Sequence, residues 1–149
     1  MPMRLGTEMP PLAGATEWIN GEPNIEAGKV VLVHFWAVSC HICHETMPEV
    51  LRLRDEYAEH GLVTIAVHMP RMEEDTDISR VQADIERYRI TQPCAIDNGH
   101  KLANAFSNEY TPAFFVFGND GTLTFRAAGD KGFAKVEPKV REALGLANL

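Results

Sequence analysis

The sequence predicts an α/β protein with a mixed central sheet, helices on both faces and an antiparallel hairpin near the C-terminus. Residues 30–37 and 62–68 form two almost continuous apolar runs, which are typical of strands buried on both faces. A helical pattern follows each run and is long enough for the crossover between parallel strands. A turn sequence at 119–121 joins two further apolar runs and indicates the hairpin.

The first half of the chain is expected to contain an extension and two strand–helix units. Residues 1–28 are rich in turn formers and predict an irregular or hairpin-bearing N-terminal extension. The expected elements after it are a strand at 30–37, a helix at about 43–59, a strand at 62–68 and a helix at about 78–89. Gly61 ends the first helix, Pro70 ends the second strand, and Asp77 or Thr76 is the expected N-cap of the second helix.

The second half is expected to complete the sheet. Its elements are a short strand at 94–96, a helix at about 100–107, strands at 113–117 and 122–127, and a last helix within 131–145. The turn Asn119-Asp120-Gly121 has the chemistry of a type I′ turn. Pro138 leaves the start of the last helix open.

The length of 149 residues predicts a single domain, 1–149, with 1–28 as its extension. The net charge of −7 argues against nucleic acid or anionic lipid as a partner, because both need a basic face. No run reaches the ~18 apolar residues of a membrane span, and the first ten residues hold no apolar segment of a signal peptide. We therefore expect a cytoplasmic protein, and a monomer.

Cys40-His41-Ile42-Cys43 lies directly after the first strand, at the start of a helix that contains Pro48. Two cysteines at this spacing can form a disulfide, and a helix N-terminus stabilises a thiolate. We expect Cys40, at or near the N-cap, to be the nucleophile of dithiol–disulfide exchange. Cys43, one turn later and more buried, is then the resolving thiol. His41 can donate a hydrogen bond to the thiolate, which would make the pair more oxidising.

Two separate segments carry a resemblance to the thioredoxin superfamily. The first runs from Phe35-Trp36-Ala37 through Cys40 and Cys43 to Pro48, and the second is Tyr110-Thr111-Pro112 followed by an apolar strand. Within the superfamily, the helix-bearing insert at 70–90 and the N-terminal extension are similar to the TlpA/ResA-like thiol–disulfide oxidoreductases.

The resemblance implies a thioredoxin fold, a cis peptide bond at Pro112 and no cofactor beyond the Cys40–Cys43 disulfide. It also implies protein disulfide substrates, which would pair with the backbone of Thr111, and an unidentified electron donor that recycles the dithiol. Trp36, beside the thiols, would cap the site, although core packing would give the same sequence.

His34 is a departure from the best-known members of this superfamily, which have a buried aspartate six residues before the first cysteine. That aspartate accepts the proton of the second thiol. His34 either shuttles the same proton or is a hydrogen-bonded core residue, and His68 on the next strand is its candidate neighbour. Cys94 is expected to be a buried structural thiol.

Four rival functions are weaker. Cys40, Cys43 and His44 could bind copper or zinc, as in a metallochaperone, but a structural zinc site needs a fourth ligand. The string Cys-x-x-Cys-His also matches a haem attachment motif, which requires export. Peroxide-reducing relatives would need a threonine where this chain has Ala37. Non-enzymatic interaction modules usually lose one cysteine. We therefore expect an enzyme, a thiol–disulfide oxidoreductase that acts on proteins and works in the direction of substrate reduction.

Overall fold

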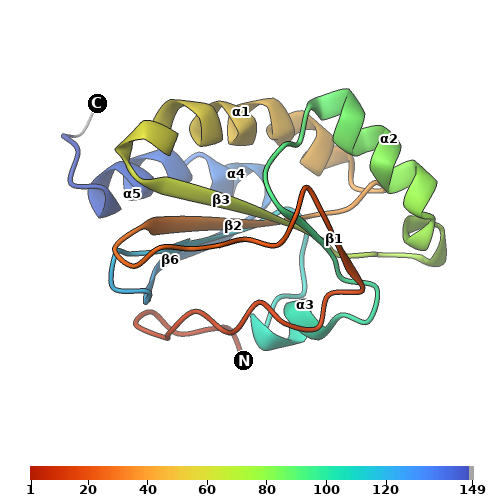
Figure 1. Ribbon diagram of the computed structural model, residues 1–149, viewed down its shortest axis with the longest axis horizontal. Helices are drawn as coiled ribbons and strands as arrows, with labels where there is room; N and C mark the ends of the chain where they lie inside the picture. Colours follow the sequence, from red (N-terminus) through yellow and green to blue (C-terminus); the bar gives the residue numbers. More distant parts are fainter. Residues whose placement is uncertain (148–149) are drawn as a thin grey trace.

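The computed structural model describes residues 1–147 and shows a six-stranded sheet between two layers (Figure 1). The strands are β1 (Glu17–Ile19), β2 (Val30–Trp36), β3 (Leu62–His68), β4 (Cys94–Ile96), β5 (Ala113–Phe117) and β6 (Leu123–Ala128). The α-helices are α1 (His41–Tyr57), α2 (Ile78–Tyr88), α3 (Lys101–Ala105), α4 (Gly129–Phe133) and α5 (Val136–Ala143). Short 3₁₀ helices cover Ala58–His60 and Glu73–Thr76.

The sheet has the order β1-β4-β3-β2-β5-β6 and is mixed. β2, β3 and β4 are parallel, whereas β5 and β6 form an antiparallel hairpin on the other side of β2. The predicted α/β class with parallel strands early and a late hairpin is confirmed. Because β2 is paired on both sides and covered on both faces, all seven of its residues are buried, as a continuous apolar run requires.

Three apolar clusters fill the space on the two faces of the sheet. Alternate residues of β2 face opposite sides. Val31, Val33 and Phe35 pack with α3 and the N-terminal segment, which lie below the sheet in Figure 1. Leu32 and Trp36 belong to the two clusters on the other face, which contain residues of α1, α2 and α5.

The N-terminal extension adds a strand that the sequence did not predict. β1 pairs antiparallel with β4, and Glu8 forms an isolated bridge with Thr122 near the other end of the sheet. The extension thus contacts both edges of the sheet. Its strand is only three residues long and lies among turn formers, so its sequence carries no clear alternation.

The hairpin turn is not of the expected type I′. That turn needs two central residues with positive φ, and in this turn only Gly121 has one, at +81°. Gly121 N instead donates to Gly118 O over 2.9 Å, and a register shift follows at Val116/Phe117. Asn119 and Asp120 have no positive φ, and the glycine at the last turn position provides the left-handed conformation.

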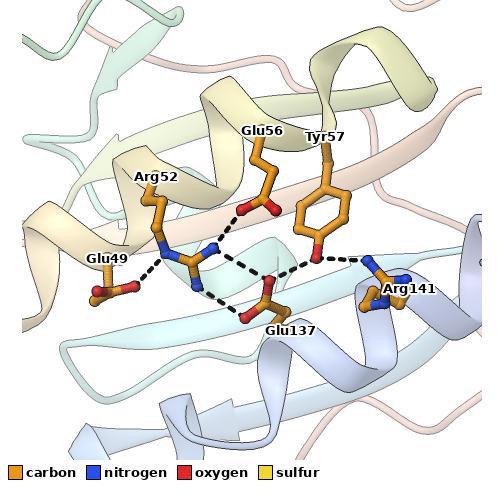
Figure 2. A network of polar contacts seen from close by, with 6 residues as sticks. All are labelled: Glu49, Arg52, Glu56, Tyr57, Glu137 and Arg141. Carbon is orange, nitrogen blue, oxygen red and sulfur yellow. Dashed lines mark hydrogen bonds and ion pairs between the residues drawn. The ribbon is translucent and has the colours of Figure 1, made fainter. Parts of the chain in front are cut away.

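The predicted last helix is two helices, α4 and α5. Pro138 is the third residue of α5, in the first turn, where its missing N–H costs no intrahelical hydrogen bond. A polar network joins α5 to α1 (Figure 2). Glu137 binds Arg52 over 2.8 Å and accepts a hydrogen bond of 2.5 Å from the buried Tyr57 hydroxyl, which Arg141 also contacts.

Candidate active site

Cys40 and Cys43 form a disulfide at the N-terminus of α1, the helix that follows the central strand β2. Cys40 is the N-cap, with an extended backbone, and its Sγ accepts a hydrogen bond of 3.1 Å from the Cys43 N–H. Cys40 is partly exposed, whereas Cys43 is 1% exposed. A helix N-terminus with free N–H groups favours an anionic sulfur at the accessible position.

The loop before β5 lies at the same edge of the sheet as this disulfide. β2 and β5 are antiparallel, with Phe35 opposite Ala113, so the end of β2 meets the beginning of β5. The Thr111–Pro112 peptide bond is cis. Pro112 is buried, and its carbonyl accepts a hydrogen bond of 3.0 Å from Gly129 N, while Thr111 is partly exposed.

A third segment, residues 69–76 after β3, connects these two loops. Asp75 is completely buried, and its Oδ2 accepts a hydrogen bond of 2.7 Å from Ser39 Oγ, next to Cys40. The Arg71 guanidinium donates to Thr111 Oγ1 over 2.9 Å. Sequence reasoning missed Asp75 and Arg71, since Asp75 is one of four acidic residues in the run 73–77 and nothing in that run distinguishes it.

His68 and Trp36 are neighbours in the paired strands β3 and β2, and both lie beneath the active-site segment. The Val38 N–H donates to His68 Nε2 over 3.2 Å, so the ring proton of the neutral imidazole is on Nδ1. Burial lowers the pKa of His68 to about 4. Trp36 is 1% exposed and packs edge-on against the His68 ring, with 4.8 Å between centroids. Trp36 is thus a core residue under the site.

His34 lies on the same face of β2 as Trp36 and is also buried. Its Nε2 is 2.9 Å from the side-chain nitrogen of Gln92, and Gln92 Oε1 accepts a hydrogen bond of 2.6 Å from Arg54. A guanidinium can only donate, so Gln92 must present its oxygen to Arg54 and its NH₂ group to His34. His34 Nε2 is therefore an acceptor, and Nδ1 carries the proton.

The same surroundings keep His34 uncharged. Burial, and then the positive charge of Arg54, lower the pKa of His34 to about 3. An imidazole with this pKa remains neutral at physiological pH. His34 can orient its neighbours by hydrogen bonding, but a base near neutrality would need a higher pKa. The predicted contact between His34 and His68 is absent from the hydrogen bonds of residues 1–147, in which each ring has its own partner.

His41 and His44 both pair with carboxylates. His41 is exposed, and its Nε2 lies 2.8 Å from Glu45 Oε1 one turn along α1. His44 Nε2 lies 2.9 Å from Asp84 Oδ2 and so joins α1 to α2. Within residues 1–147, no three His, Cys, Asp or Glu side chains are grouped as metal ligands. The three side chains of the metal alternative thus have other partners: the two cysteines bind each other and His44 binds Asp84.

Cys94 is the third cysteine and is fully buried on β4. Burial raises the pKa of its thiol to about 12. It therefore stays protonated and unreactive.

A mixed sheet with a Cys-x-x-Cys disulfide at the start of the helix after its central strand, beside a proline loop, defines the thioredoxin-like thiol–disulfide oxidoreductases. The chain belongs to the AhpC/TSA family, whose sequence profile matches residues 17–126. It is 42% identical over 145 residues to the thiol–disulfide oxidoreductase YkuV of Bacillus subtilis, covering 95% of this chain and 97% of YkuV. Protein DipZ of Mycobacterium tuberculosis is 32% identical over 91% of this chain, which spans 20% of DipZ.

Solved structures agree with this assignment. A thioredoxin-like protein in its oxidised form, 42% identical, superimposes with a TM-score of 0.88 over 96% of this chain and 98% of that one. A DsbE-type thiol:disulfide interchange protein from Chlorobium tepidum, 19% identical, has a TM-score of 0.82 over 96% and 99% of the two chains, which bears on the fold alone. No helix within residues 1–147 has the length and apolar character needed to cross a membrane.

Proposed function

We propose that this protein reduces disulfides in protein substrates, with Cys40 as nucleophile and Cys43 as resolving thiol. The observation that carries the proposal is the asymmetry of the pair: Cys40 is accessible and accepts a helix N-terminal N–H, while Cys43 is buried beneath it. The alternative of soft-metal binding by Cys40, Cys43 and His44 has no comparable support, since His44 pairs with Asp84.

The reaction has two exchange steps. The Cys40 thiolate attacks one sulfur of the substrate disulfide, so that a Cys40–substrate disulfide forms and the substrate bond breaks with release of a thiolate. Cys43 then attacks Cys40 Sγ, which forms the internal disulfide and frees the second substrate sulfur. Two electrons pass from the dithiol to the substrate, and its two sulfurs each end with a proton. An external dithiol donor restores Cys40 and Cys43.

The exposed apolar side chains around the site suit a protein substrate. Ile42, Met72 and Tyr110 are 39%, 53% and 62% exposed. They belong to the three segments that hydrogen bonds join at the site, which contain Cys40, Asp75 and Thr111. Large exposed apolar groups around a polar centre are typical of surfaces that bind other proteins. Thr111 and Pro112 would then present backbone to an extended substrate segment.

The direction of the reaction follows from the proposed compartment. In the cytoplasm the glutathione poise is about −220 to −320 mV, which keeps most accessible dithiols reduced. In the disulfide form, the His41 imidazole is paired with the Glu45 carboxylate. A hydrogen bond from His41 to the Cys40 thiolate would make the couple more oxidising, and the pairing with Glu45 weakens this effect.

The experiment that tests this function is a thiol-trapping titration of the purified protein across a glutathione redox series, read by mass. We expect a reversible two-electron change confined to Cys40 and Cys43, with Cys94 unchanged. A midpoint near the roughly −270 mV of thioredoxin would support the reductant. A midpoint near about −120 to −180 mV would indicate an oxidant or isomerase instead, and a pair that never forms a disulfide would refute the function.

A further inference from the structure

The strongest unassigned feature near the site is the buried carboxylate of Asp75. It is 0% exposed, yet it lies beside the segment that carries the nucleophile. Its Oδ2 accepts hydrogen bonds from Ser39 Oγ, from Arg71 N over 2.8 Å and from Met72 N over 3.3 Å. Neither exchange step uses this group, and a buried charge without a counter-ion costs free energy in the folded state.

Asp75 is a charged group. Burial alone would raise its pKa, but the hydrogen bonds from Ser39, Arg71 and Met72 outweigh it and hold the pKa below its usual range. No side-chain nitrogen of Lys, Arg or His within residues 1–147 lies within ion-pair distance of this carboxylate. Its second oxygen, Oδ1, also has no hydrogen-bond partner there. The negative charge is thus held in place without a neutralising cation.

The neighbouring titratable groups do not cancel this charge. His68 on β3 is neutral because its pKa is about 4. Arg71 directs its guanidinium to Thr111, and His44 of α1 is paired with Asp84 of α2. A fixed negative charge close to Cys40 opposes the formation of a thiolate there, because like charges repel in the weakly screened interior. The disulfide form carries no charge at this position and is not penalised.

On these grounds we propose that Asp75 is a positioning residue that holds the segment before Cys40 and whose charge makes the Cys40–Cys43 couple more reducing. The inference rests on the proposed exchange reaction. Ser39 links the two groups, because its hydroxyl donates a hydrogen bond to Asp75 and it is the residue that directly precedes Cys40 in the chain. The charge favours the direction expected for a cytoplasmic reductant.

The test is Asp75→Asn, which keeps the shape and an oxygen acceptor for Ser39 while it removes the charge. Two quantities are measured: the equilibrium with glutathione, by thiol trapping and mass, and the pH profile of Cys40 alkylation by iodoacetamide. We expect the equilibrium to shift towards the dithiol by about threefold to tenfold, as removal of one nearby charge predicts, and the Cys40 thiol pKa to fall. An unchanged equilibrium and an unchanged profile would overturn the proposal.

Two control variants separate charge from position. Asp77→Asn removes an exposed carboxylate two residues away and should leave the equilibrium within about twofold, because solvent screens it. Ser39→Ala removes the hydroxyl contact but keeps the Asp75 charge, and should also leave the equilibrium within about twofold. If Ser39→Ala shifts it as much as Asp75→Asn does, the charge has no role and the proposal fails.

A second uncharged variant, Asp75→Ser, covers the case in which Asp75→Asn does not fold, because its smaller side chain also removes the charge and keeps a hydroxyl for hydrogen bonding. We expect it to shift the equilibrium towards the dithiol and to lower the Cys40 thiol pKa, as Asp75→Asn does. An unchanged equilibrium and an unchanged alkylation profile in Asp75→Ser would refute the proposal. Failure of the exchange reaction itself is recognised separately, because the parent would then show no reversible couple.

Discussion

The side chain of His34 ends a line of three polar groups that runs from the core under α1 to the partly exposed Arg54. Gln92 is the middle member, and its backbone is itself held by the Asn20 amide, which donates to Gln92 O over 3.0 Å. The donors of Arg54 fix the orientation of the Gln92 amide, and that amide fixes the tautomer of His34. A residue on the surface of α1 thus decides which nitrogen of a buried histidine carries its proton.

This arrangement predicts the effect of Gln92→Glu. A carboxylate at this position could accept from both Arg54 and His34, so the proton should move to His34 Nε2 and the His34 pKa should rise from about 3 towards its ordinary 6.5. Two-bond ¹H–¹⁵N correlation spectra report both the tautomer and the titration. Gln92→Leu, which removes the donor without adding a charge, is the matched control. A His34 that keeps its Nδ1–H tautomer in Gln92→Glu would contradict the argument.

The asymmetry of the two cysteines gives a second prediction at the residue scale. Cys43→Ser removes the resolving thiol and should accumulate disulfides between Cys40 and substrate proteins, visible as reducible high-mass bands. Cys40→Ser removes the accessible thiol and should lower insulin reduction by at least about 10³-fold, since the buried Cys43 cannot replace it. Full insulin-reducing activity in Cys40→Ser would show that the nucleophile is assigned incorrectly.

At the scale of elements, α1 is the helix on which the site and the scaffold meet. Cys40 caps its N-terminus and Cys43 lies in its first turn, while its last two turns hold Arg52 and Tyr57, which bind Glu137 of α5 (Figure 2). Arg52 also binds Glu49 over 2.6 Å and pairs with Glu56 on the same helix. The hydrogen bonds from Arg52 to Glu137, opposed by partial burial, lower the pKa of Glu137.

Glu137→Gln should destabilise the protein by about 1–2 kcal/mol. The buried Tyr57 hydroxyl and the Arg52 guanidinium would both lose a charged acceptor, and charged hydrogen bonds of this kind contribute about that much. Urea unfolding at pH 7 measures the change. Glu56→Gln is the control, because that pair is exposed and lies within one helix, where about 0.3–0.5 kcal/mol is typical. The prediction fails if the two substitutions cost the same.

The elements also show what the sequence alone could predict. β2, β3 and β5 are long apolar runs, and their ranges followed from composition and period. β1 was missed because its three residues depend on the edge of β4 for their hydrogen bonds, which no local pattern records. The Cys-x-x-Cys pair was found from spacing, whereas Asp75 and Gln92 act through contacts 36 and 58 residues away in sequence.

The whole molecule places its buried histidines on one side of the sheet, under the helices that carry the site. His34 lies on the face of β2 that carries Trp36, and His68 pairs with Trp36 on β3, so both share the side of the sheet on which Trp36 packs with α1 and α2. Both are almost completely buried. Each is neutral in the folded state for the same reason, that burial disfavours the charged ring. In the unfolded chain both rings are in water and titrate near 6.5. Below pH 6.5 the unfolded chain therefore binds a proton at each of these two histidines, whereas the folded chain does not.

The two histidines make the folded state less stable as the pH falls below 6.5. Above pH 6.5 both states hold these rings neutral, so they contribute no change. Below it the unfolded state gains protons first, and stability falls by about 1.4 kcal/mol per pH unit for each histidine, until the folded rings titrate at about 4 for His68 and about 3 for His34. Between pH 7 and pH 5 the two histidines together should cost about 4 kcal/mol. Asp75 and Glu137 have lowered pKa values in the folded state. Their contribution to stability is lost only below about pH 4.5, where the unfolded chain protonates these carboxylates first.

Urea unfolding of the disulfide form at pH 7 and pH 5 checks this prediction. His34→Gln should recover about 2 kcal/mol of the difference between the two pH values, although it lowers stability at pH 7 through altered packing, because a glutamine at position 34 does not titrate. His60→Gln, at an exposed position, should leave the difference unchanged. If His34→Gln and His60→Gln behave alike, the buried imidazole of His34 must be charged in the folded state, and the hydrogen bond from Gln92 could not then have the direction assigned to it.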